Sequence, residues 1–295
     1  MNEINYQDIF FNIERFKLAT KNIVHGFITG RHQSPFHGFS VEFSDHRPYN
    51  SGDSTQFIDW KLYAKTDKYY IKRYQDETNV RVYIIIDHSR SMMFSTTKTN
   101  DKLYQSKLIA STIAYMALKQ KDAVGLYTVN KQITSYLPAK AKINWLDQIL
   151  QNLNKFDGSG TTDFSECLHE IADKTKKRNL IIMISDYLDD SDSIISAMKH
   201  FKYNMNDLIL VQVNDPIELD LDYRGTLEIH DIETDESLNV NASEIKNEYI
   251  KHIDNHYHKI KESCLKLNFD YIDFKTTDDF SKILSSYMYK RNTMI

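Results

Sequence analysis

The chain has 295 residues, of which 41% are hydrophobic and 26% are charged, a composition that excludes a mainly disordered protein. Lys and Arg number 37 against 41 Asp and Glu, and the net charge of −4 excludes the basic surface that general nucleic-acid binding needs. Only 8 Gly and 4 Pro occur, which argues against long flexible linkers and Gly-rich nucleotide loops.

The cysteine pattern and the apolar runs indicate the compartment. Cys167 and Cys264 fit neither a disulfide framework nor a Cys-x-x-Cys metal site, so we expect two buried thiols in a reducing environment. The longest apolar runs, at 82–86 and 180–184, are far shorter than the roughly 20 residues of a membrane helix. Acidic residues within the first 16 positions argue against a signal peptide, and we therefore expect a cytoplasmic protein.

The pattern before residue 80 is mixed. Apolar residues at helical spacing predict an amphipathic helix in the first twenty-odd positions, and alternation over 39–43 predicts a half-buried strand. Asp53 or Ser54 is predicted to cap a short helix that carries Trp60 on one face. Residues 69–75 are predicted to form another strand.

From residue 80 onward, strand and helix patterns alternate, beginning with a β-branched run typical of a strand buried on both faces. This alternation predicts an α/β fold with a doubly wound, mostly parallel sheet over 80–295, preceded by an N-terminal α+β extension over 1–79. Expected strands lie at 80–86, 123–129, 132–137 (returning antiparallel), 180–185, 207–213 and 269–274; expected helices lie at 103–119, 142–153, 163–174, 191–201 and 243–267 and at the C-terminus, with a β-hairpin insertion near 216–240.

Polar side chains follow the first strand of this predicted sheet. Ligands of doubly wound sheets bind beyond the carboxyl ends of the strands. There, Asp87, Ser89 and Ser91 alternate along a loop, so their side chains can converge while those of His88 and Arg90 point away. Ligands that offer only oxygen suit a hard cation such as Mg²⁺.

Two further segments complete a pattern. Asp186 follows the strand predicted at 180–185, and the loop at 158–163 delivers the hydroxyl of Thr162. An Asp-x-Ser-x-Ser loop, then a Gly-Thr-Asp type loop, then a strand ending in Asp resembles the metal-ion-dependent adhesion site of the von Willebrand factor A-like fold. The resemblance covers about residues 80–295.

The preceding segment resembles the signature of the bacterial domain-of-unknown-function family 58, and extends the likeness to nearly the whole chain. Many members carry membrane helices before this region, and this sequence resembles the short, soluble branch without them. The matching stretches are GFSVEF at 38–43, RPY at 47–49, GD at 52–53 and IDW at 58–60, with further likeness at Lys107 and around Arg291.

The resemblance implies roles for individual residues. Ser89, Ser91 and Thr162 are expected to bind Mg²⁺ directly, with Mn²⁺ or Ca²⁺ as alternatives, whereas Asp87 and Asp186 act mostly through water. An acidic side chain of a partner protein completes the coordination shell. The family further implies a non-enzymatic adaptor or chaperone-like cofactor of a MoxR-type AAA+ ATPase, which binds the ATPase or its client, with no nucleic acid and no membrane insertion.

Other interpretations stay open. A metal-dependent phosphoester hydrolase is the alternative enzyme class, and a structural domain with a vestigial metal site is the third. Without a metal role, Asp87, Ser89 and Ser91 cap the following helix, Thr162 is a helix N-cap, and Asp186 is a turn residue.

Arg47, Asp53, Asp59 and Trp60 of the N-terminal segment have two interpretations. They form either a surface on which a partner docks or a structural group. We favour the second, in which Asp59 pairs with Arg47 and Trp60 fills the core.

Overall fold

In a computed structural model, the described residues are 17–21, 23–24, 45–49, 58–73, 80–96, 101–156, 164–176, 178–223, 225–230 and 237–294. The chain divides into two compact units: Arg31–Asn79, and Met1–Gly30 together with Val80–Ile295. The strand predicted at 39–43 lies outside the described residues, as do Asp53 and Ser54. None of the helices in the described ranges combines the length and apolarity needed to cross a bilayer.

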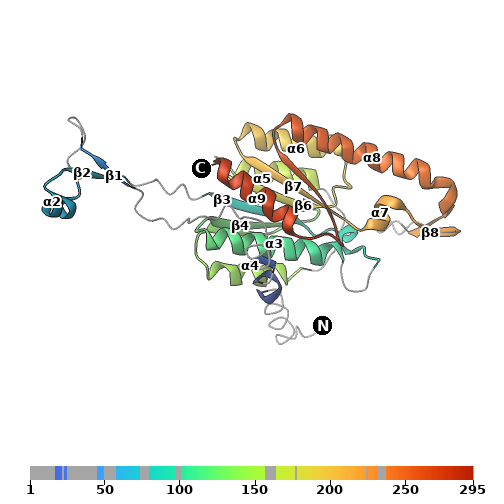
Figure 1. Cartoon of the computed structure of the whole chain (residues 1–295). Helices are drawn as coiled ribbons and strands as arrows, with labels where there is room; N and C mark the ends of the chain where they lie inside the picture. Colours follow the sequence, from blue (N-terminus) through green and yellow to red (C-terminus); the bar gives the residue numbers. More distant parts are fainter. Residues whose placement is uncertain are drawn as a thin grey trace. The chain divides into compact units, whose positions relative to one another are not determined.

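The larger unit is built on a six-stranded sheet with the order β10-β7-β6-β3-β4-β5 (Figure 1). All neighbours pair parallel except β4 and β5, which pair antiparallel as predicted. The strand order reverses between β3 and β6, which confirms the doubly wound, mostly parallel α/β fold. The strands are β3 (Arg81–Asp87), β4 (Ala123–Val129), β5 (Ile133–Lys140), β6 (Leu180–Ser185), β7 (Asp207–Asn214) and β10 (Asp270–Lys275).

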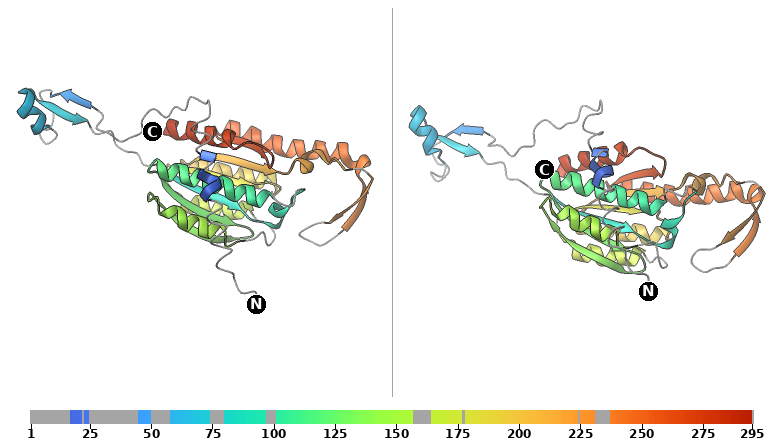
Figure 2. Two further views of the ribbon diagram at one scale, coloured as in Figure 1. Left: turned by 60° about the horizontal axis from the view of Figure 1, so that its bottom comes forward. Right: turned by 90° about the horizontal axis from the view of Figure 1, so that it is seen from below.

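Helices cover both faces of this sheet (Figures 1 and 2). One face carries α3 (Lys102–Lys119), α4 (Trp145–Leu153) and α9 (Ser281–Met294); the other carries α5 (Phe164–Lys174), α6 (Ser191–Tyr203) and α8 (Ala242–Lys266). Residues 17–21 are helical and lie against α3, where Thr20 Oγ1 is 2.9 Å from Ser111 Oγ.

Continuous apolar runs form the central strands, as the sequence predicts. Ile84, Ile85 and Ile86 of β3 are fully buried, and so is every apolar residue of β6. Such strands are apolar on both faces because helices cover both sides of the sheet. The free thiols Cys167 and Cys264 are buried, as expected.

An insertion follows β7. It contains α7 (Pro216–Asp220) and an antiparallel hairpin of β8 (Thr226–His230) and β9 (Ser237–Asn241), which confirms the hairpin predicted near 216–240. The sequence pattern did not predict α7. This short helix has a capping box, in which Asp215 and Glu218 each accept a hydrogen bond from the other's backbone N–H.

The smaller unit contains β1 (Asp45–Pro48), β2 (Tyr70–Arg73) and α2 (Trp60–Thr66), with β1 and β2 antiparallel. The predicted cap at Asp53 or Ser54 lies outside the described residues. Helix α2, which begins at Trp60, is capped by Asp59, because this residue is extended and its Oδ1 accepts hydrogen bonds from the N–H groups of Lys61 (3.0 Å) and Leu62 (3.1 Å).

A buried ion pair joins the C-terminal helix to the sheet. Arg291 on α9 donates from Nε to Asp122 Oδ2 at 2.5 Å and from Nη2 to Asp122 Oδ1 at 3.2 Å, and the Asp122 side chain has no exposed surface. Tyr287 OH lies 3.4 Å from the same carboxylate. A buried charge depends on its partner, because water cannot replace it.

We therefore expect Asp122→Ala to lower the free energy of unfolding by about 3–5 kcal/mol, because Arg291 is left buried without its carboxylate. Urea denaturation measures the loss. The control is Asp173→Ala on the solvent-facing side of α5, where the carboxylate is 70% exposed and the expected loss is under about 1 kcal/mol. Equal losses in the two variants would contradict a buried, stabilising pair.

Candidate functional site

Two carboxylates emerge at the point where the strand order reverses. β3 and β6 are parallel neighbours, with Ile86 opposite Ile184, so both strands end at the same edge of the sheet. Asp87 is the last residue of β3 and Asp186 directly follows β6. Both residues are buried, at 1% and 2% exposure.

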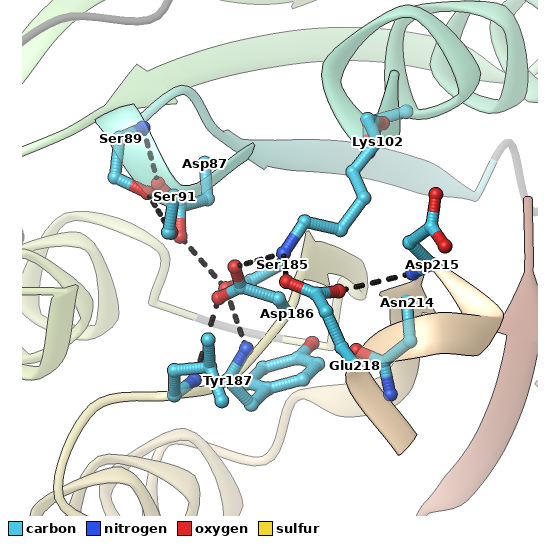
Figure 3. Close-up of polar contacts among 12 residues, drawn as sticks. Asp87, Ser89, Ser91, Lys102, Ser185, Asp186, Tyr187, Asn214, Asp215 and Glu218 are labelled. Atoms are coloured by element: carbon cyan, nitrogen blue, oxygen red, sulfur yellow. Dashed lines mark hydrogen bonds and ion pairs between the residues drawn. The ribbon is translucent and has the colours of Figure 1, made fainter. Parts of the chain in front are cut away.

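The loop after β3 brings its oxygen atoms together (Figure 3). Asp87 Oδ1 accepts a hydrogen bond from the N–H of Ser89 at 2.8 Å, which folds the loop back over the end of the strand. Ser91 is the second residue of the 3-10 helix η2 (Arg90–Met93), and its Oγ lies 3.0 Å from Ser89 Oγ. Two hydroxyl oxygens at this separation are close enough to bind one ion.

Ser185, at the end of β6, links the two strand ends. Its hydroxyl donates to Asp87 Oδ2 at 2.7 Å and accepts from the N–H of Tyr187 at 3.0 Å. Both oxygens of Asp87 are therefore engaged by protein donors, which suits a carboxylate that acts on an ion through water.

His88 is directed away from this cluster, as expected. It is buried, its Nε2 lies 2.7 Å from Thr134 Oγ1 on β5, and its ring centroid lies 4.7 Å from that of Phe156. Arg90 is exposed. The bulky ring of His88 therefore does not crowd the serine hydroxyls.

The chain turns sharply after Asp186. Tyr187 adopts the left-handed conformation with φ 54°, although its side chain is fully buried. This conformation costs about 1–2 kcal/mol for a residue with a Cβ, and here Tyr187 OH offsets it by donating to Met183 O at 2.7 Å. Asp186 is further held by the N–H of Leu188, 3.3 Å from its Oδ1.

A buried lysine completes the cluster. Lys102, the first residue of α3, donates from Nζ to Asp186 Oδ2 at 2.9 Å and to Glu218 Oε1 on α7 at 2.6 Å, and its side chain has no exposed surface. In Figure 3, Ser89 and Ser91 lie on one side of Asp186 while Lys102 and Glu218 lie on the other. The lysine therefore joins α3, the end of β6 and α7.

The α7 cap connects this group to the segment after η2. Glu218 Oε2 accepts from the N–H of Asp215 at 3.0 Å. Asp215 in turn accepts from the N–H and the hydroxyl of Thr96, at 2.9 and 3.0 Å. These hydrogen bonds therefore link α7 to the segment that follows η2.

The carboxylates repel one another. Burial, and secondly the charge of Asp186, raise the pKa of Asp87 from 3.8 to about 7. When Asp87, Asp186 and Glu218 are all ionised, Lys102 balances only one of their three charges. These four groups then carry a charge of −2, before the buried carboxylate of Asp215 is counted, and a divalent cation would reduce this excess.

The described donors suit a hard cation. Within the described ranges, no group of three or more His, Cys, Asp or Glu side chains could hold a metal by itself, so an ion here needs hydroxyl ligands. Ser89 and Ser91 supply two, with Asp87 and Asp186 behind them, and oxygen ligands of this kind fit Mg²⁺. Thr162 lies outside the described residues.

The structure describes only part of the N-terminal group formed by Arg47, Asp53, Asp59 and Trp60. Asp59 is buried and caps α2, a structural role, whereas the side chain of Arg47 and all of Asp53 lie outside the description. The prediction that Trp60 fills the core is wrong. Trp60 is 59% exposed at the first position of α2, with its ring 6.1 Å from that of Tyr63.

The sequence reasoning missed Lys102 and Glu218. A signal for the lysine was present, because a cation in the first turn of a helix is opposed by the helix dipole, and such a residue needs a compensating anion. Glu218 has a signal as well, since Asp215-Pro216-Ile217-Glu218 is the capping-box pattern with Pro at the first helical position, but this pattern marks a helix start and not a contact with Lys102.

The raised pKa of Asp87 has a measurable effect. Its folded value of about 7 exceeds the unfolded value near 3.8, so between these pH values the native state binds more protons than the unfolded state. With EDTA present, this group lowers the free energy of unfolding as pH rises from 5 to 7, by up to about 1.4 kcal/mol per pH unit.

Urea denaturation of the protein and of Asp87→Asn across pH 5 to 8 isolates this contribution, because the amide does not titrate. We expect the difference in stability between the two proteins to change with pH in favour of Asp87→Asn. Parallel pH profiles would show that Asp87 titrates normally.

Comparison with known proteins identifies the family of this chain. Residues 45–259 match the family model described as "Protein of unknown function DUF58". Uncharacterized proteins of Mycobacterium tuberculosis and Mycobacterium bovis are each 19% identical over 227 residues, covering 75% of this chain and 70% of theirs. The crystal structure of the conserved hypothetical protein BatB from Bacteroides thetaiotaomicron has a similar fold, with a TM-score of 0.50 and 15% identity over 72% of this chain and 99% of that one. Because the family model spans well over half of its length, the chain belongs to the DUF58 family.

Proposed function

We propose that this protein is a non-enzymatic, metal-dependent binding module that captures an acidic side chain of a partner protein through Mg²⁺. The fold of this family supports a protein-interaction module in general. The observation that carries the finer proposal is the 3.0 Å separation of the Ser89 and Ser91 hydroxyl oxygens beside two buried carboxylates.

Each group has a defined task in this proposal. Ser89 and Ser91, together with Thr162, would hold the ion directly. Asp87 and Asp186 would orient the bound water from behind, since their oxygens already accept hydrogen bonds from Ser185, Leu188 and Lys102. The ion supplies positive charge at the edge of the sheet.

The preference for an acidic partner follows from the ligand set. Hydroxyl groups are neutral, and carboxylates that act through water neutralise an ion less than direct ligands do. Mg²⁺ bound in this way retains attraction for an anionic oxygen, and a carboxylate from another protein is the ligand that a hard cation accepts.

We further propose that the partner is a MoxR-type AAA+ ATPase or its client, with this chain acting as an adaptor or chaperone-like cofactor. Support comes from the likeness of the chain to its family. We propose a cytoplasmic location, in which the two free cysteines remain reduced.

The ion should stabilise the folded protein, because the unfolded chain has no site for it. At a Mg²⁺ concentration 100 times its dissociation constant, the gain is about 2.7 kcal/mol, which raises the melting temperature by several degrees. Ser89→Ala with Ser91→Ala should abolish the shift. A shift that survives this double substitution would place the ion elsewhere.

Partner capture is tested by a pull-down with the MoxR-type ATPase of the same genome, with Mg²⁺ or with EDTA. We expect binding only with Mg²⁺, and loss of binding in the Ser89→Ala, Ser91→Ala variant. Ser263→Ala is the matched control, because its hydroxyl donates only to Lys259 O within α8 among its described contacts. Binding that is unchanged both by EDTA and by the double substitution would refute the mechanism.

A further inference from the structure

We propose that Lys102 is a positioning residue that sets the charge of the metal site: its ammonium acts as a permanent counter-cation that holds Asp186 away from direct coordination and weakens the site's affinity for divalent ions. This inference rests on the proposed metal site. It assigns a function to a residue that contacts neither the ion nor the partner.

The geometry restricts Asp186. Its Oδ2 accepts from Lys102 Nζ at 2.9 Å, and its Oδ1 accepts from the N–H of Leu188 at 3.3 Å. Both oxygens are thereby oriented by protein donors, and the stronger, charge-assisted bond comes from Lys102. A carboxylate held in this way reaches an ion through water more readily than by direct contact.

The lysine itself cannot move aside at low cost. Its side chain has no exposed surface, and its second contact, Glu218 Oε1 at 2.6 Å, draws the ammonium toward α7. Glu218 is in turn fixed by the N–H of Asp215. Breaking one of these contacts would leave a buried charge unpaired, which is strongly unfavourable.

A purely structural ion pair would need only one carboxylate. Here one ammonium lies between a carboxylate of the proposed metal site and a carboxylate outside it, and it stands in the first turn of α3, where the helix dipole disfavours a cation. The local charge of Asp87, Asp186, Glu218 and Lys102 is −2 when all four are ionised. Each substitution at Lys102 or Glu218 changes that sum in a known direction.

Three variants separate the effect of the local charge on metal affinity from a loss of folding stability. Lys102→Met keeps an apolar stem of similar length and makes the sum −3; Glu218→Gln makes it −1; the double variant restores −2. We measure the dissociation constant of Mn²⁺ by the electron paramagnetic resonance signal of the free ion, with Mg²⁺ in competition. Lys119→Met, at the exposed far end of the same helix, is the control for the loss of a lysine.

We expect Lys102→Met to bind Mn²⁺ about tenfold more tightly than the unmodified protein, Glu218→Gln about tenfold more weakly, and the double variant within about threefold of it. All three lose stability in urea, because each disrupts buried polar contacts. Opposite shifts in affinity alongside losses of stability in the same direction distinguish a charge-setting residue from a structural ion pair.

Shifts in the same direction, or no shift, would overturn the inference about Lys102. If Lys102→Met does not fold, the comparison of Glu218→Gln with the double variant tests the same point, since removing the lysine there should restore affinity. Failure of the proposed function is distinguishable: the unmodified protein would then bind no Mn²⁺, or Ser89→Ala with Ser91→Ala would leave Mn²⁺ binding unchanged.

Discussion

The site depends on one constraint, the placement of two carboxylates at the ends of adjacent central strands. β3 and β6 meet where the strand order reverses, so the loops after them diverge over opposite faces and leave their first residues side by side. Asp87 and Asp186 are buried there, and their mutual repulsion adds to the effect of burial in raising the pKa of Asp87 to about 7. Every other polar contact of the site can be understood as a response to this placement of like charges.

Two kinds of group oppose the repulsion. Neutral donors, such as the Ser185 hydroxyl and the N–H of Ser89, stabilise the charge of Asp87 without cancelling it. Lys102 cancels one charge but also brings Glu218 into the cluster. When these carboxylates are ionised, an excess of negative charge remains after the described protein contacts are made, and this excess is the physical argument for a cation.

The sequence predicted most of the sheet and part of the site, for identifiable reasons. Continuous β-branched runs marked β3 and β6, because strands covered by helices on both faces are apolar throughout, and the short segment after β4 was predicted to return antiparallel. Asp87, Ser89, Ser91 and Asp186 could be found because they lie at the ends of these strands or in the loops just after them. The roles of Lys102 and Glu218 were missed, since Lys102 contacts Asp186 and Glu218 across 84 and 116 residues of the chain, and local signals do not show such contacts. Trp60 was misplaced because its large apolar ring suggested a core position, whereas the residue stands on the exposed surface of a small unit.

In the proposed function, the same electrostatics would couple the stability of the fold, the binding of the ion and the binding of the partner. An ion that neutralises buried carboxylates would stabilise the native state. If the ion increases the affinity for an anionic ligand of the partner, that ligand increases the affinity for the ion by the same factor. A site with very high intrinsic affinity for the ion would stay occupied and gain little from this coupling. In the proposed function, Lys102 cancels one carboxylate charge and would keep the affinity for the ion moderate, so that the site is not already saturated and a partner can raise its occupancy. In this view the buried lysine makes capture conditional on both ligands, which is the property that a reversible adaptor needs.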